Sequence, residues 1–131
     1  MTSNDSSPAA ESWVRFTYKT GEYAGRLVEE GSPRSVVETL AVLRHPEQGD
    51  LHNPYNPDVP FFHERRALAH REKALVPNRD IGPYAAAQLP DYNESREQAV
   101  KKSLEELDRL QRWAARASEQ LKTVASEYRP S

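Results

Sequence analysis

Residues 12–46, SWVRFTYKTGEYAGRLVEEGSPRSVVETLAVLRHP, decide the fold. The apolar side chains of Val14, Phe16 and Tyr18 alternate with polar ones, which is the period of a half-buried strand. Turn residues follow at 20–22, where Gly21 is expected to supply a positive φ, and again at 31–33. The stretch therefore predicts three consecutive strands, at about 14–19, 23–30 and 34–44.

The third of these strands is the most apolar. Its apolar residues fall on both faces, which indicates an internal strand enclosed by the rest of a small sheet structure. Three short strands with tight turns form a meander, and a small barrel is an economical way to protect the edges of a meander. The interpretation is a mainly β protein with an added helical part.

Composition excludes several classes of protein. The chain has 131 residues, no cysteine and a formal net charge of −2. Disulfides, thiolate metal sites, catalytic thiols and acylated cysteines are therefore excluded, and a general nucleic-acid binder would carry a basic excess. The sequence shows no signal peptide, no apolar run long enough to cross a bilayer, no nucleophile elbow and no glycine-rich phosphate loop. We expect a cytoplasmic protein without a membrane anchor, which is not an enzyme and has no cofactor.

The chain divides into three parts. Residues 1–11 are polar and are expected to form a disordered tail. Residues 12–90 are expected to form the barrel, with a long loop at 45–66, because seven of the ten prolines lie from Pro46 to Pro90. Residues 91–131 are expected to be helical, with Asp91 and Asn93 as candidate caps.

The loop at 45–66 is the best candidate for a binding surface. It contains too many glycine, proline and asparagine residues for regular structure, and loops of this length are usually functional or disordered. Aromatic and arginine side chains concentrate binding energy in protein interfaces. Because neighbouring residues of an extended segment point opposite ways, we expect at least one of the two adjacent phenylalanines, Phe61 and Phe62, to fill the open end of the barrel. The candidate partner-binding residues are His45, Gln48, Asp50, His52, Phe61, Phe62, His63 and Arg65.

Two segments leave alternatives open. Residues 65–76 have the propensity of a helix, but they follow a meander that needs closing strands, so helix and strand are equally favoured. In the helical part, apolar residues recur every seven positions from Val100 to Tyr128, with Leu110, Ala117 and Val124 three further on. This face is expected to pack within its own chain, and a homodimer or partner seam is the alternative.

The polar residues allow two alternative functions. Three histidines, His45, His52 and His63, could bind a divalent ion, but their spacings match no known ligand motif, so no metal is expected. A basic run could contact phosphates, which gives a nucleic-acid or ribosome-associated module as the alternative function, although a solvated surface is the ordinary explanation. The basic run consists of Arg65, Arg66, Arg71 and Lys73.

Several long peptides resemble the kinase-associated protein B family of spore-forming Firmicutes. They are YKTGEY at 18–23 with Gly25, LAVLRHP at 40–46, QGDLHNP at 48–54, DVPFFHERRALA at 58–69, PDY at 90–92 and EY at 127–128. The resemblance implies an SH3-like β-barrel followed by a C-terminal helical extension, and it implies that residues 67–76 are a strand of the barrel. It also implies a break near 108–112, where the helical pattern of this chain favours one continuous helix.

The resemblance further implies a function. Proteins of this family are accessory proteins that support a sensor histidine kinase in the sporulation phosphorelay, and no catalytic residues come with the family. One family member is described as a lipoprotein, but the present chain has no cysteine to acylate. We therefore expect a non-enzymatic regulatory protein that acts through protein–protein contacts with a sensor histidine kinase.

Overall fold

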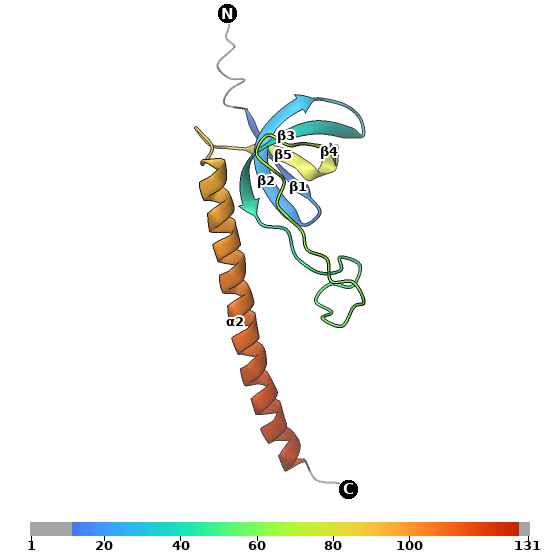
Figure 1. Ribbon diagram of the computed structural model, residues 1–131, viewed down its shortest axis with the longest axis vertical. Helices are drawn as coiled ribbons and strands as arrows, with labels where there is room; N and C mark the ends of the chain where they lie inside the picture. Colours follow the sequence, from blue (N-terminus) through green and yellow to red (C-terminus); the bar gives the residue numbers. More distant parts are fainter. Residues whose placement is uncertain (1–11, 129–131) are drawn as a thin grey trace, which may run out of the picture. The chain divides into compact units, whose positions relative to one another are not determined.

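The computed structural model describes residues 12–128, so the predicted tail at 1–11 lies outside the described residues. Five strands form one antiparallel sheet in the order β4-β3-β2-β1-β5, followed by one long helix (Figure 1). The elements are β1 (Trp13–Tyr18), β2 (Gly21–Glu29), β3 (Arg34–Arg44), β4 (Lys73–Pro77), the 3₁₀ helix η2 (Asn78–Asp80), β5 (Ile81–Tyr84) and α2 (Tyr92–Glu127). The three predicted strands are therefore present, within two residues of the expected positions.

The turn between β1 and β2 differs from the prediction. Tyr18 pairs with Gly21, and the two residues between them, Lys19 and Thr20, have φ angles of 48° and 70°. Two left-handed residues are typical of the tight hairpin turn whose twist matches that of the strands. Gly21 does not supply the positive φ. It is needed because a Cβ there would lie 2.5 Å from the hydroxyl oxygen of Tyr23.

The core lies against the inner strands of the sheet. Phe16 is buried between two exposed neighbours in β1, as the alternation predicted. Its ring stacks on that of Tyr23 in β2, with centroids 5.5 Å apart. In β3 the buried residues fall on both faces, and β3 is an internal strand with β2 and β4 as its neighbours. Val37 and Val42 of β3 complete the centre of the core together with Val76 of β4.

The protein is mainly β with a C-terminal helix, as predicted, but a closed barrel is not confirmed. Strands β4 and β5 are the two edges of the hydrogen-bonded order, and no pairing between them occurs among residues 12–128. The prediction of a strand at 67–76 is wrong for residues 67–72, which are irregular, and right for the remainder, which belongs to β4. The SH3-like barrel therefore stays a prediction.

Residues 67–72 are irregular, although backbone hydrogen bonds join residues 71 and 72 to Thr39 of β3, and side chains satisfy part of the remaining backbone. The hydroxyl of Tyr23 accepts a hydrogen bond from the Leu68 N–H at 3.3 Å, and the hydroxyl of Tyr92 donates to the Leu68 carbonyl. The Ala69 N–H donates to the side chain of Glu72 at 2.8 Å. Burial raises the pKa of Tyr23 above its ordinary value. Leu68 is thus held between the sheet and the first turn of α2.

Helix α2 begins at Tyr92 and is continuous to Glu127, so the break implied by the family resemblance is absent. Asp91 caps it, because a side-chain oxygen of Asp91 accepts the Glu94 N–H at 3.1 Å. The buried Ser95 hydroxyl accepts the Val42 N–H of β3 at 2.9 Å. Among residues 12–128, no helix has the length and apolar character needed to cross a membrane.

The chain forms two compact units. The first extends to Val100 and includes the sheet, the loop at 45–66 and the first turns of α2. The second starts at Lys101 and consists of the remaining turns of α2 within the described residues. The predicted domain boundary between residues 90 and 91 stays a prediction. Tyr92 and Ala99 of the helix belong to the hydrophobic core.

Candidate functional site

The loop at 45–66 follows β3, extends away from the sheet and then runs back toward it (Figure 1). Its two sides are joined by the side chain of Gln48. The side-chain oxygen Oε1 of Gln48 accepts the backbone N–H of Arg65 at 2.7 Å, and the side-chain nitrogen Nε2 donates to the backbone carbonyl of Arg65 at 2.9 Å. A backbone hydrogen bond from Gly49 to His63, at 2.8 Å, adds a third connection. These bonds give the base of the loop the pairing that a strand would otherwise supply.

The guanidinium of Arg65 reinforces the same base. One of its terminal nitrogens donates to the carbonyl oxygens of Glu47 and Gly49, at 3.1 and 2.5 Å. Gln48 and Arg65, two of the predicted partner-binding residues, therefore point their polar groups into the loop itself. Their structural role is to position the loop, which leaves fewer of their donors for a partner.

The outer part of the loop is built from side-chain turns. Asp50 accepts the side-chain amide of Asn53 at 3.0 Å and the backbone N–H of His52 at 2.9 Å. These hydrogen bonds, the one from Asn53 first, lower the pKa of Asp50 below its ordinary value. The carboxylate of Asp50 thus forms a turn, and His52 is an exposed residue of the same turn.

Glu47 connects this loop to the β1–β2 hairpin. Its backbone N–H donates to the Thr20 hydroxyl at 2.9 Å, and its carboxylate accepts the hydroxyl of Tyr55 at 3.2 Å. At the same end of the loop lies His45, one of the predicted partner-binding residues, with its Nδ1 3.0 Å from the carbonyl oxygen of Pro46. The loop is therefore anchored at its base and at one flank by contacts within the first unit.

The aromatic residues of the loop remain exposed despite this anchoring. The exposed fractions are 72% for Phe61 and 58% for Phe62. Neither phenylalanine is buried, so the expectation that at least one of them fills the open end of the barrel is wrong. Phe61 stacks on the ring of His63, with centroids 4.9 Å apart and planes 9° apart. The ring of Phe62 lies over Gly49, where a Cβ would come within 3.1 Å of it.

We define the aromatic surface as Tyr55, Phe61, Phe62 and His63. Its side chains are exposed, and the loop that carries them is closed at its base by the hydrogen bonds described above. Rigid aromatic groups lose little entropy when a partner covers them. Such a surface can bind an apolar patch of another protein. Tyr55 was not among the predicted site residues, although an exposed tyrosine among loop-forming residues is a signal that could have found it.

The histidines do not assemble a metal site. No group of three or more histidine, aspartate or glutamate side chains in residues 12–128 is placed to hold an ion. His45 lies at the base of the loop, while His63 is stacked on Phe61. The structure therefore gives the alternative built on His45, His52 and His63 no geometric support.

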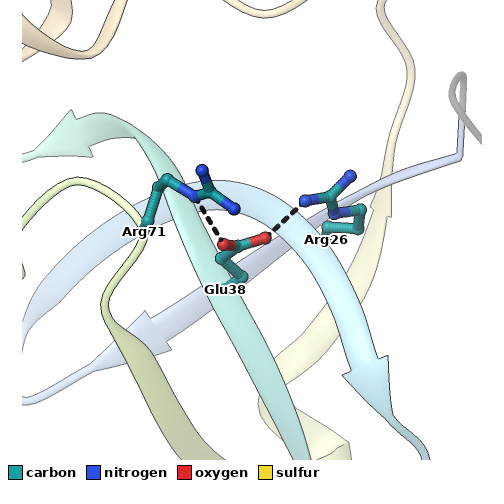
Figure 2. A network of polar contacts seen from close by, with 3 residues as sticks. All are labelled: Arg26, Glu38 and Arg71. Atoms are coloured by element: carbon teal, nitrogen blue, oxygen red, sulfur yellow. Dashed lines mark hydrogen bonds and ion pairs between the residues drawn. The ribbon is translucent and has the colours of Figure 1, made fainter.

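A charged cluster that sequence reasoning missed lies on the sheet (Figure 2). The carboxylate of Glu38 in β3 is buried, with 5% of the residue exposed. Arg26 of β2 donates to one of its oxygens at 2.6 Å, and Arg71, just before β4, donates to the other at 3.1 Å. The hydrogen bond from Arg26, and then that from Arg71, lowers the pKa of Glu38 against the opposing effect of burial. The cluster joins three successive parts of the sheet.

These contacts also change the interpretation of the predicted basic run. Of its four members, Arg65 binds carbonyl groups of its own loop and Arg71 pairs with Glu38. A phosphate-binding surface needs cations whose charge is free to neutralise the backbone of a nucleic acid. Two of the four cations are instead used within the protein, which weakens the nucleic-acid alternative.

Comparison with known proteins identifies the family. The sequence profile of a family described as Kinase associated protein B matches residues 18–129. The chain belongs to the kinase-associated protein B family. It is similar to Kinase-associated lipoprotein B of Bacillus subtilis (strain 168), with 41% identity over 116 residues, which cover 88% of this chain and 90% of the relative. It is also similar to the crystal structure of kinase-associated protein B from Bacillus cereus, with a TM-score of 0.64 and 35% identity, covering 76% of this chain and 78% of that one.

Proposed function

We propose that this member of the kinase-associated protein B family is a non-enzymatic accessory protein that supports a sensor histidine kinase of the sporulation phosphorelay in the cytoplasm. Membership of the family supports a kinase-associated role, and the names of both relatives include that association. The known features of the site agree with binding rather than chemistry. Its polar groups are engaged in holding a loop, and its exposed groups are aromatic.

The aromatic surface is the proposed kinase-docking site. The observation that carries this assignment is the exposure of Phe61 and Phe62 on a loop whose base is closed by hydrogen bonds. A mobile loop would lose conformational freedom on binding, whereas this one is already ordered, so more of the contact energy appears as affinity. Of the eight predicted residues, Phe61, Phe62 and His63 would contact the kinase, and Gln48 and Arg65 would position them.

The test is binding of the purified full-length protein to the cytoplasmic part of a sporulation sensor histidine kinase. The double variant Phe61→Ala with Phe62→Ala is expected to raise the dissociation constant by about thirtyfold, the effect of losing a single strong interface anchor. Leu75→Ala is the matched control, because Leu75 is an apolar residue of β4 with 55% exposure. Equal affinity of the double variant and the wild type would refute the docking site.

The same experiment separates docking from folding. Both phenylalanines lie outside the core, so the double variant should unfold at the same denaturant concentration as the wild type. A second readout is the autophosphorylation rate of the kinase with and without the protein. Stimulation by wild type and by Leu75→Ala, but not by the double variant, is the expected result.

A further inference from the structure

The part of α2 after Val100 has the repeat of a coiled coil. Leu107, Ala114 and Leu121 recur every seven residues, and Leu110, Ala117 and Val124 lie three positions after them. The four large side chains of this set are exposed to between 38% and 66%. An apolar repeat of 3.5 residues, sustained over several turns, is the pattern with which one helix faces another helix along its length.

The facing helix has to be identified. Within residues 12–128, the only other helical segment is η2, which has three residues and cannot cover a face of this length. The face runs for about 25 Å from Leu107 to Val124, at the usual rise of about 1.5 Å per residue. A facing helix of this length therefore has to come from another molecule.

The order of side-chain sizes along the seam is symmetric. Two large residues, two alanines and two large residues follow one another: Leu107, Leu110, Ala114, Ala117, Leu121 and Val124. We propose that α2 pairs with α2 of a second copy in antiparallel orientation, about a two-fold axis between residues 115 and 116. Leu107 then faces Val124 of the second copy, Leu110 faces Leu121, and Ala114 faces Ala117. Large layers at both ends enclose a small central layer, where the two backbones come close together.

Charge agrees with self-pairing. No charged residue occupies the seam between Leu107 and Val124, and charges such as Arg112, Arg116 and Glu119 fall on the outward positions of the repeat. The flanking positions nearest the axis are uncharged, so Trp113 would lie beside Gln120 of the second copy. Opposed helix dipoles favour the antiparallel arrangement further.

The area available is that of a weak dimer. A fully buried leucine or valine side chain removes roughly 60–120 Å² from water, and an aromatic one about 150–250 Å². Scaled by their exposed fractions, the apolar side chains from Leu104 to Tyr128 provide about 500 Å² per chain, or about 1,000 Å² for the pair. This total is at the lower limit for a specific interface, so the dimer should dissociate on dilution.

Sedimentation equilibrium of the full-length protein over a wide concentration range tests the dimer. The wild type is expected to shift from one to two chains as concentration rises. Leu110→Glu with Leu121→Glu places two carboxylates in each of two layers, which should raise the dissociation constant by at least about a hundredfold. Ala115→Glu with Thr123→Glu adds the same charge on the outward side and should leave the dimer intact. A wild type that stays monomeric throughout overturns the proposal.

Orientation can be tested because the chain contains no cysteine. In the antiparallel register, Leu107→Cys mixed with Val124→Cys gives a mixed disulfide under mild oxidation, while neither variant alone gives a cross-linked dimer. Cross-linking of Leu107→Cys to itself would instead show a parallel pair and refute the register. The double variant Phe61→Ala with Phe62→Ala should dimerise like the wild type, so failure of the kinase-docking site and failure of this dimer are distinguishable.

Discussion

Replacing Glu38 by glutamine should destabilise the sheet at neutral pH and should have little effect in acid. Glu38 is a buried carboxylate between two guanidinium groups, and charge-assisted hydrogen bonds of this kind contribute about 1.5–3 kcal/mol each. Glutamine keeps the shape and one acceptor oxygen but loses the charge. The side chains of Arg26 and Arg71 are 48% and 69% exposed, so both regain water when released, and the net loss is about 2 kcal/mol.

The sign of the pH dependence follows from the lowered pKa of Glu38. Its stabilisation is complete above the ordinary glutamate value of 4.5 and is lost as the pH falls through the lower value of the folded state. Urea unfolding at about pH 7 should therefore separate the wild type from Glu38→Gln by about 2 kcal/mol, and the difference should shrink towards about pH 2.

Two results would refute this reasoning. A difference between wild type and Glu38→Gln that is the same at both pH values would show that charge is not its cause. A loss below about 0.5 kcal/mol at neutral pH would show that hydration of the arginines offsets the whole cluster. In a double-mutant cycle, the coupling of Glu38 to Arg26 should exceed that to Arg71, because the Arg26 hydrogen bond is the shorter at 2.6 Å against 3.1 Å.

Three further substitutions test the packing. Gly25→Ala would place a Cβ 1.8 Å from the Glu38 carbonyl oxygen, so it should cost about 3 kcal/mol or prevent folding, and a thermal midpoint equal to that of the wild type would contradict this close approach. Thr39→Val should stabilise by about 1 kcal/mol in urea unfolding, because the buried Thr39 hydroxyl has no hydrogen-bond partner in the described part of the chain; a loss of stability would argue against that. Gly49→Ala meets both a φ of 97° and the ring of Phe62, so it should speed hydrogen exchange of the residue-49 amide without shifting global unfolding, and unchanged exchange would show that the loop adapts.

The sequence predicted the elements whose pattern is local. Burial of one face of a strand produces the alternation at Val14, Phe16 and Tyr18, and burial of both faces produces the apolar third strand. Both strands are present in the sheet. The helix was predictable from its seven-residue repeat and from Asp91, which caps it. Strand β5 and the 3₁₀ helix η2 were not predicted, since a strand as short as β5 carries too few residues for a period to show.

The features that were missed depend on contacts between distant residues. Residues 67–72 have the composition of a helix, but they are irregular. The side chains of Tyr23 and Tyr92 bind the backbone of Leu68, and residues 71 and 72 bond to the backbone of Thr39, which no local pattern reveals. The pairing of Gln48 with Arg65 likewise joins residues 17 positions apart. Sequence reasoning selected the loop as a binding surface, but it expected at least one of the two phenylalanines to be buried. It also could not separate the residues that fix the loop from the residues that the loop exposes.

The first turns of α2 determine where the chain can be shortened. A protein ending after residue 90 would lack the hydroxyls of Ser95 and Tyr92, leaving the Val42 N–H and the Leu68 carbonyl without the hydrogen bonds they have in the full chain. One ending after Val100 would retain both bonds and the buried Ala99. We therefore expect the shorter fragment to be insoluble or degraded and the longer one to fold. The smallest unit suitable for spectroscopy or crystallisation of the sheet thus includes nine residues that belong to the helix.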